Sequence, residues 1–350
     1  MKIRDRKHIR RAFQQGLTLV ELMIGLVIGL VMTGAISYLF IDASRNYRIT
    51  ENLARMQETS RFAFDKIGRD ARAAGYYGCA GEEVTIDNML NSSTDYLYRF
   101  GAAVEAFVAP ASGWPAAMIG GFGTPSVVDA YSTTRQSIQN LVSGSHILTL
   151  RGLPDGDISV RSQPGGSSIK FTNTNGIKQG DILLVTTCRN AAVFQVSQVQ
   201  NPTAQNPFTN VVHNTGQIGN PAIPPGNATN KTDEDLAGGE VMRVATMTYF
   251  VAVSPFHNRP SLFRRTTSSD AVEIARNVTN IQIEAGLDND GDRQTDEFLS
   301  TASIPTADWE KVRAIRVQLT LESEDQSLAP DGGPLTYTTT TTFALRNRLP

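Results

Sequence analysis

The chain has 350 residues, a formal net charge of −2 and an aromatic content of 7%. This length leaves room for one or two domains, and the near-zero net charge excludes a broad basic field that would attract nucleic acid. Threonine, serine, asparagine and glycine are abundant, which is typical of a β-rich extracytoplasmic domain with long polar loops.

A long apolar stretch follows a basic N-terminus. The first 15 residues carry six Lys or Arg against one Asp, and residues 17–41 contain a single charged side chain, Glu21. A helix of that length, rising about 1.5 Å per residue, spans roughly 37 Å and can cross a hydrocarbon core of about 30 Å. The excess of positive charge before it predicts a cytoplasmic N-terminus, with the rest of the chain across the membrane.

Glu21 is unusual because a carboxylate in lipid costs at least a few kcal/mol, so that such a residue usually faces a partner. Gly16 and the mainly apolar residues 17–20 precede it. This arrangement resembles the type IV prepilin signal, in which a dedicated prepilin peptidase cuts after the glycine. The resemblance implies that Leu17 becomes an N-methylated N-terminus, with Glu21 as the fifth residue of the mature chain. The amine of one subunit and the Glu21 carboxylate of a neighbour would then offset each other's desolvation.

Two other interpretations of this stretch stay open. In one, the helix is an uncut signal anchor whose Glu21 is tolerated near the membrane interface. In the other, Ala35-Ile36-Ser37 is an ordinary cleavage site after an apolar signal core. The second interpretation conflicts with the length of the apolar run and with the charge inside it.

The helical pattern continues beyond this stretch. Residues 42–74 contain no proline, and their apolar residues recur mostly at steps of three and four, which predicts one helix of about 55 residues that ends at Gly75. Its apolar half spans residues 17–44 and its amphipathic half residues 45–75. A sheet must cover the apolar stripe, whereas Asp65 and Asp70 are expected on the wet face. The stripe comprises Leu53, Met56, Ala63, Phe64, Ile67, Ala71 and Ala74, and the polar face also comprises Glu51, Arg55, Glu58, Arg61 and Arg69.

The rest of the chain is predicted to be rich in β-strands. Residues 82–145 show no clear period and are interpreted as loops with short elements, and the Asn- and Pro-rich residues 200–235 as a long exposed loop. In residues 311–322 apolar and polar side chains alternate, which is typical of an antiparallel strand with one packed face and one wet face. The strand-like runs are residues 146–150, 158–160, 169–172, 182–187, 193–199, 247–253, 311–322 and 337–345.

Two segments resemble the PilW family of minor type IV pilins: the block RDARAAGYYGCAG at residues 69–81 and the segment FALRNR at residues 343–348. The resemblance implies an α+β pilin fold, in which one long N-terminal helix packs on the antiparallel sheet of a β-rich globular domain at residues 76–350, after a cleaved leader at residues 1–16. It also implies a stage in the inner membrane with the globular domain in the periplasm, and later a place in the pilus at the cell surface. The implied partners are the prepilin peptidase, other minor pilins, the major pilin and a tip adhesin.

The chain contains two cysteines, Cys79 and Cys188. An even count in an exported chain favours a disulfide, because the compartment is oxidising. The bond would close a loop of about 110 residues and stabilise the domain by roughly 4–5 kcal/mol if loop entropy dominates. Two buried free thiols are the alternative, and neither cysteine lies in a C-x-x-C pair that would indicate zinc or redox chemistry.

An acidic segment follows the strand-like residues 281–285. Acidic residues at alternate positions can direct several oxygens towards a hard cation, and Gly291 allows the tight bend that this needs. The spacing resembles D-x-D-x-D calcium loops, but it departs from the EF-hand in the position of its glycine and in lacking a glutamate at the twelfth position. The alternative is a solvated acidic turn between strands. The predicted Ca²⁺ ligands are Asp288, Asp290 and Asp292, with Asp296 or Glu297 completing the shell.

Catalytic patterns are absent from the sequence, since the four histidines are scattered and no H-E-x-x-H, G-x-S-x-G or phosphate-loop pattern occurs. We therefore expect a minor pilin, not an enzyme, that takes part in type IV pilus assembly and priming and in presentation at the cell surface. One alternative is a pseudopilin of type II secretion. Another is a signal-anchored periplasmic protein that binds calcium or another ligand, which predicts an uncut N-terminus.

Overall fold

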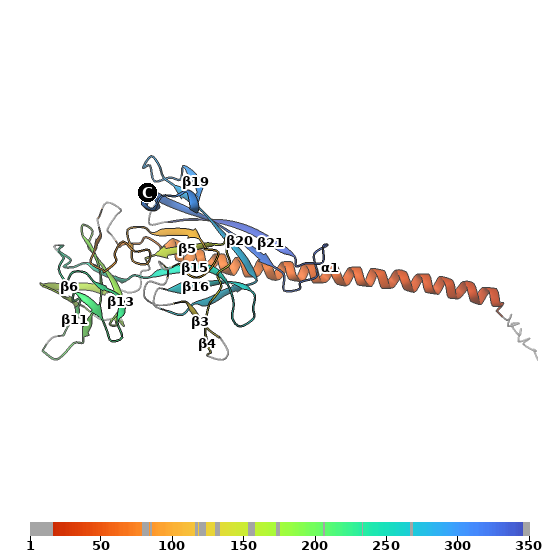
Figure 1. The fold of residues 1–350 in the computed structure, drawn as a ribbon, viewed down its shortest axis with the longest axis horizontal. Coiled ribbons are helices and arrows are strands. Elements are labelled where there is room, and N and C mark those ends of the chain that lie inside the picture. The colour runs from red at the N-terminus through yellow and green to blue at the C-terminus, as the bar shows by residue number, and fades with distance from the viewer. Residues whose placement is uncertain are drawn as a thin grey trace, which may run out of the picture. The chain divides into compact units, whose positions relative to one another are not determined.

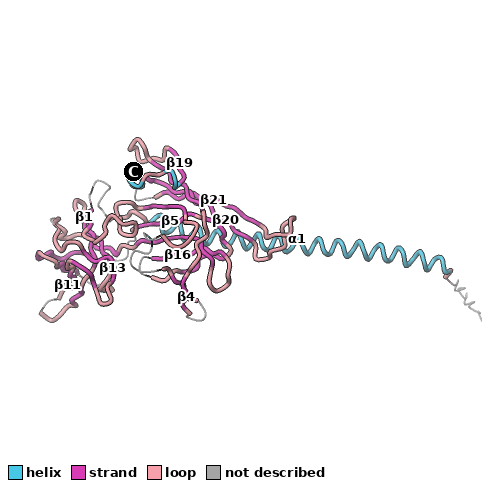
Figure 2. The backbone as a smooth tube through the Cα atoms, in the orientation of Figure 1, coloured by secondary structure: helices cyan, strands magenta, loops and turns pink. Residues whose placement is uncertain are grey.

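The computed structural model describes residues 17–78, 84, 86–115, 118, 124–129, 134–152, 158–172, 176–205, 207–232, 234–266 and 269–345. The chain divides into two compact units, Met1–Asn52 and Leu53–Pro350, which are described separately. Strands dominate the second unit (Figures 1 and 2). The elements are α1 (Leu19–Ala73), β1 (Ile86–Asn88), β2 (Val104–Val108), β3 (Ser126–Val128), β4 (Arg135–Ser137), β5 (His146–Arg151), β6 (Ile158–Gly165), β7 (Ser168–Phe171), β8 (Ile182–Thr186), β9 (Ala191–Gln195), β10 (Gln198–Gln200), β11 (Thr209–Val212), β12 (Gly216–Ile218), β13 (Ile223–Asn227), β14 (Glu240–Arg243), β15 (Thr246–Val253), β16 (Pro260–Thr266), β17 (Val272–Arg276), β18 (Val278–Leu287), β19 (Glu297–Ser300), the 3₁₀ turns η1 (Thr301–Ser303) and η2 (Thr306–Lys311), β20 (Val312–Glu322) and β21 (Thr336–Ala344).

The helix α1 has 55 residues, which agrees with the predicted length. Among the described residues it is the one helix that is long and apolar enough to cross a membrane. In the first unit its apolar side chains lie exposed, with Leu30 at 76% of its full accessible surface. In the second unit the helix ends two residues before Gly75, whose φ of +71° favours glycine. The N–H of Gly75 donates to the carbonyl of Arg151 over 2.9 Å.

The amphipathic half of α1 buries most of its apolar stripe as predicted, but Phe64 is half-buried and Leu53 is 38% exposed. The stripe packs against two sheets, a five-stranded sheet of order β17-β16-β15-β5-β2 and a four-stranded sheet of order β19-β18-β20-β21. Their inner faces share one apolar core with the helix, which includes Ile67, Ala71, Tyr249 and Val317. The helix approaches the four-stranded sheet so closely that a Cβ added at Gly68 would lie 2.7 Å from the Phe343 ring.

A third sheet has eight strands in the order β1-β9-β8-β14-β6-β7-β11-β10 and holds a separate apolar core around Phe171 and Phe194. Its strands pair antiparallel except for β1 with β9. One long helix with largely antiparallel sheets confirms the α+β class. The strands predicted at residues 247–253, 311–322 and 337–345 are also confirmed, since β15, β20 and β21 begin and end within one residue of these bounds.

One loop prediction is wrong, because residues 200–235, predicted as a long exposed loop, contain β11, β12 and β13. Residues 82–145, interpreted as loops with short elements, contain the short strands β1 to β4. Tertiary contacts hold residues 200–235 in place, and no local sequence pattern indicates these contacts. The Asn227 side chain accepts a hydrogen bond from the backbone N–H of Gln195 over 2.7 Å and donates to its carbonyl over 2.8 Å. Asn227 is fully buried as a result.

The prediction for Asp70 is also wrong. Asp65 lies on the exposed face of α1 and pairs with Arg69 one turn on, but the side chain of Asp70 is only 14% exposed. Its Oδ2 accepts a hydrogen bond from the Tyr249 hydroxyl over 2.5 Å and another from Nε of Arg264 over 2.6 Å. This carboxylate therefore fastens the end of the helix to β15 and β16.

Candidate functional site

The processing site predicted at the N-terminus lies at the boundary of the described residues. Gly16 falls outside them, whereas Leu17 is described and exposed. Thr18 precedes the first residue of α1, so it occupies the N-cap position. Leu17, on the C-terminal side of the candidate cleavage point, therefore lies outside the helix, which begins two residues later.

Glu21 closes the first turn of α1. Its Oε2 accepts hydrogen bonds from the backbone N–H and the hydroxyl of Thr18, both over 3.0 Å, and its own N–H donates to the Thr18 hydroxyl over 3.2 Å. This reciprocal arrangement is a capping box of the form Thr-x-x-Glu. The Thr-x-x-Glu spacing is visible in the sequence, but the prediction for Glu21 rested on the cost of a charge in lipid and did not include this cap. A carboxylate in this position also interacts favourably with the positive end of the helix dipole.

The surface around Glu21 is apolar and uncovered. Among the described residues, the side chains from Leu17 to Ile41 lie exposed, including Leu19, Val20 and Leu22 beside the carboxylate. Burial of such a surface is favourable by about 25 cal/mol per Å². The segment therefore has a strong tendency to enter a bilayer or to pack against other helices, and it would carry one carboxylate into either environment.

The acidic segment begins at the buried end of β18. Asp288 is 3% exposed, and its carboxylate accepts the N–H of Gly291 over 2.7 Å, the N–H of Arg293 over 3.0 Å and Nε of Arg313 over 3.0 Å. Gly291 and Arg293 have φ of +84° and +66°, so the turn wraps around this side chain. Burial raises the pKa of Asp288, but these three donors together outweigh it and the pKa lies below its usual value.

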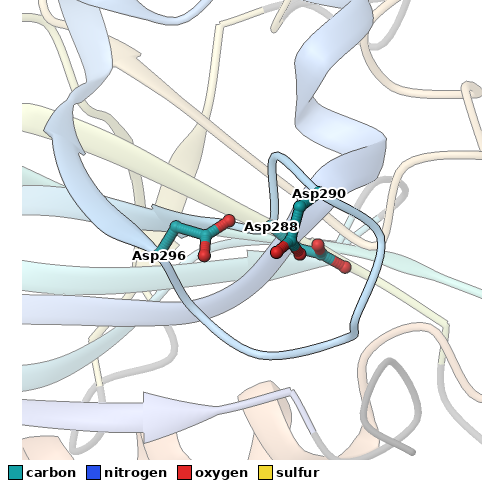
Figure 3. Close-up of side chains that lie close together, drawn as sticks. All are labelled: Asp288, Asp290 and Asp296. Atoms are coloured by element: carbon teal, nitrogen blue, oxygen red, sulfur yellow. The ribbon is translucent and has the colours of Figure 1, made fainter.

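Three of the predicted metal ligands lie together. Carboxylate oxygens of Asp288, Asp290 and Asp296 lie within 4.8 Å of one another (Figure 3). Asp292 accepts the N–H of Gln294 over 2.7 Å and its side-chain amide over 2.9 Å, and Glu297 accepts the amide of Asn289 over 2.8 Å. Neither belongs to the group of three.

The three carboxylates suit a hard cation in charge and in donor type. Each carboxylate has about four lone-pair sites, so Asp288 keeps acceptor capacity beyond the bonds it already accepts. The guanidinium of Arg313 supplies part of the compensating positive charge without an ion. The loop thus buries the Asp288 carboxylate and leaves Asp290 and Asp296 exposed. A cation would join a group of carboxylates in which Asp288 already pairs with Arg313.

Cys188 lies at the turn between β8 and β9 and is disulfide-bonded. Cys79 lies outside the described residues, so the predicted pairing of the two stays a prediction. The bond at Cys188 agrees with an oxidising compartment.

A cluster that sequence reasoning missed lies beside β17. Glu273 Oε1 accepts a hydrogen bond from the Ser261 hydroxyl over 2.8 Å and lies 2.6 Å from Nε2 of His257, and the same nitrogen lies 3.4 Å from the hydroxyl. In a nucleophilic relay the imidazole stands between serine and carboxylate and uses both ring nitrogens. Here one nitrogen faces both groups, so these three side chains do not form such a relay.

Comparison with protein families gives two matches. The family model described as Type IV Pilus-assembly protein W matches residues 248–348, and that of the prokaryotic N-terminal methylation motif matches residues 11–37. The first match runs from β15 through β21, and the second contains Gly16, Leu17 and Glu21. The block at residues 69–81 lies outside both. No curated protein and no solved structure matches the chain.

Proposed function

We propose, from the premise that the chain is a type IV pilin-like protein of the PilW family, that it is processed after Gly16 and assembled as a minor pilin. The observation that carries the proposal is the exposed apolar half of α1, which bears Glu21 in its first turn within the methylation-motif match. The family match in the C-terminal part extends the resemblance first drawn from the segment at residues 343–348.

Processing would turn the start of α1 into an assembly element. Cleavage removes the basic leader and leaves an N-methylated amine on Leu17, four residues before Glu21. In the membrane the apolar half of α1 lies in lipid, and in a filament it packs against the helices of neighbours. The Glu21 carboxylate then either leaves Thr18 and pairs with the amine of an adjacent subunit, or it bonds to both. An unpaired carboxylate in that environment costs several kcal/mol, so the pairing selects one register between subunits.

The proposal includes a route and a set of partners. The protein first lies in the inner membrane with its N-terminus in the cytoplasm and its globular part in the periplasm, because positive charges precede the apolar segment. It then joins the pilus at the cell surface. Its partners are the prepilin peptidase, other minor pilins, the major pilin and a tip adhesin, and its role in assembly and priming is structural.

Mass spectrometry of the mature N-terminus tests this function. Protein purified from its native envelope is expected to begin with N-methylated leucine from position 17. An intact leader would favour an uncut signal anchor, and a start beyond Ser37 would favour an ordinary signal peptide; either result refutes the proposal. A type II secretion pseudopilin would share the methylated start, so deletion of the gene separates the two: loss of pili with normal secretion is expected, and the reverse would overturn the pilus role.

We also propose that Asp288, Asp290 and Asp296 bind Ca²⁺. The proposal is supported by three carboxylates within 4.8 Å of one another on one loop. An ion there would stabilise the folded state according to its affinity and would fix the loop between β18 and β19.

Calorimetric titration of the metal-free protein with CaCl₂ tests the site. Binding is expected in the intact protein and should be lost in Asp290→Asn. A matched control is Asp331→Asn, because Asp331 also lies in an exposed acidic turn, where it accepts the N–H of Gly333 over 3.1 Å. Absence of binding at millimolar Ca²⁺ would refute the proposed site and identify the loop as an acidic turn whose carboxylates bond only within the protein.

A further inference from the structure

Strand β21 forms an open edge of the four-stranded sheet. It has nine residues and pairs with β20 along its whole length without a register shift. Within the described part of the chain, no strand pairs with its other edge (Figure 1). An edge of this kind offers a row of backbone donors and acceptors to another chain.

Hydrogen bonds at the two ends of β21 identify the residues that face the open edge. The carbonyl of Leu335 accepts a hydrogen bond from the N–H of Ser323, and the N–H of Leu345 donates to the carbonyl of Arg313, both over 2.8 Å. Backbone groups alternate between the two edges of a strand, so the odd-numbered residues bond to β20. The even-numbered residues direct their N–H and C=O groups outward, and these are Thr336, Thr338, Thr340, Thr342 and Ala344.

This edge lacks the features that protect exposed edges in soluble proteins. Such edges are usually short, bulged, charged or interrupted by proline. The other edge strands of the two helix-facing sheets have these features: β2 and β19 have five and four residues, and β17 contains a bulge together with Glu273 and Arg276. By contrast, β21 has no charge, no proline and no bulge. Its open edge is therefore suited to pairing.

The two faces of β21 define the chemistry of a strand that would pair with it. Its even-numbered side chains are exposed on the outer face. On the inner face Phe343 is buried, whereas Tyr337, Thr339 and Thr341 are only half-buried. An added strand would place its apolar side chains on the inner face, where they would cover these half-buried residues. Its polar side chains would lie on the outer face, beside the exposed threonines of β21.

The orientation of β21 argues against an antiparallel pair of two copies, a step that rests on the proposed function. Phe343 lies against Gly68, whereas Glu324, beside the other end of β21, pairs with Arg55 over 3.5 Å, so β21 and this part of α1 run in the same direction. Two β21 strands paired antiparallel would point their helices in opposite directions, but subunits anchored by the same end of a helix share one direction. A copy in the same orientation would offer β19, which has four residues and includes Glu297.

We propose that the open edge of β21 binds an extended segment of a second, different protein, which adds as an antiparallel strand. The segment is uncharged, spans about nine residues and alternates apolar with polar side chains. Backbone hydrogen bonds to the even-numbered residues would give affinity, and the half-buried side chains around Tyr337 would give the register.

Hydrogen exchange on the full, processed protein in detergent tests the proposal with a defined probe. The probe is a synthetic peptide, TVTVTVTVT flanked by two lysines at each end, which alternates apolar with polar side chains as required and has no anchor to fix its direction. Alone, the protein should exchange the amides of Thr338, Thr340 and Thr342 fast and those of Thr339 and Thr341 slowly. The peptide should slow the first group at least tenfold and leave the second unchanged.

Variants at one position provide the controls. Thr340→Pro removes an outward N–H and leaves the pairing with β20 intact, since proline is tolerated on the open side of an edge strand. It should weaken peptide binding, measured by fluorescence anisotropy, about tenfold or more, whereas Thr340→Val should bind like the original protein. Should Thr340→Pro fail to fold, a peptide with proline at its central threonine provides the same comparison.

Several results would overturn the inference. No protection at millimolar peptide, or equal binding by the Pro and Val variants, would show that the edge does not accept a strand. Concentration-dependent protection of the even-numbered amides without peptide would identify a second copy as the occupant. Neither result affects the methylated N-terminus, so failure of this inference and failure of the proposed function remain distinguishable.

Discussion

The carboxylate of Asp70 offers the sharpest test of how α1 is held in the second unit. It accepts hydrogen bonds from Tyr249 of β15 and from Arg264 of β16. The helix supplies the one acceptor, and the five-stranded sheet supplies both donors. Asp70→Ala removes the acceptor and leaves both donors in place.

The magnitude follows from the burial of the two donors. Tyr249 is fully buried, so its hydroxyl loses its partner without access to water, which costs about 1–3 kcal/mol. The side chain of Arg264 is 25% exposed and can turn partly towards solvent, so the loss of its ion pair adds only about 1 kcal/mol. Asp70→Ala should therefore lower the free energy of unfolding by about 2–4 kcal/mol. Asp70→Asn should cost roughly half as much, because the amide keeps one acceptor oxygen.

Urea unfolding followed by tryptophan fluorescence measures this difference. Trp309 is buried in the core that contains the helix stripe, and Trp114→Phe in every variant leaves it as the single reporter. The control is Asp65→Ala, which removes an exposed pair with Arg69 and should cost about 0.3–0.5 kcal/mol. Equal midpoints and slopes for the Asp70 and Asp65 variants would refute the reasoning.

Three further predictions use other sites. Gly68→Leu should lower the free energy of unfolding by about 2 kcal/mol, because the new side chain clashes with the Phe343 ring. Phe343→Ala in the same chain should recover part of this loss. An unchanged urea midpoint for Gly68→Leu would contradict the prediction. Burial holds the pKa of His213 at about 4, below its usual value of 6.5, so the unfolded chain takes up the proton first and stability should fall by about 3 kcal/mol as the pH decreases from 6.5 to 4. His213→Phe should remove that fall in a pH series of urea midpoints, and a persistent fall of the same size would assign it to other groups. Glu21→Ala should leave cleavage and methylation of Leu17 unchanged but reduce the amount of the protein in sheared pili at least tenfold, and normal incorporation would exclude pairing with a neighbour's amine.

The sequence predicted those parts of the fold whose local pattern and tertiary role agree. Apolar steps of three and four gave the buried stripe of α1, and strict alternation gave β20, because both patterns describe a segment with one covered face. The strands between residues 200 and 235 could not be predicted in this way. They are short, and the segment that contains them is rich in proline and asparagine. Asn227 owes its position to hydrogen bonds with Gln195, 32 residues earlier.

The candidate sites show the same limit. Asp70 stands three residues after Ile67 and four before Ala74, so the helical spacing itself places it beside the buried stripe. A carboxylate there indicates a buried partner, but its partners lie 179 and 194 residues further along the chain. In the acidic loop, alternation predicted which side chains could act as ligands. It could not predict that Asp292 bonds to Gln294 instead.

The two parts of α1 should respond to mutation in opposite ways, because their surroundings differ. Residues 53–73 contribute Ile67 and Ala71 to the core of the second unit, so substitutions there change the free energy of unfolding. The side chains from Leu19 to Ile41 are exposed in the isolated subunit, and a polar substitution on that surface removes no contact that holds the second unit together. Such a substitution should therefore leave the urea midpoint unchanged and act only when the helix enters lipid or packs against other subunits. If substitutions at Leu26 or Leu30 lowered the midpoint as strongly as Asp70→Ala, the apolar half would stabilise the subunit itself, and assembly would not be needed to explain its surface.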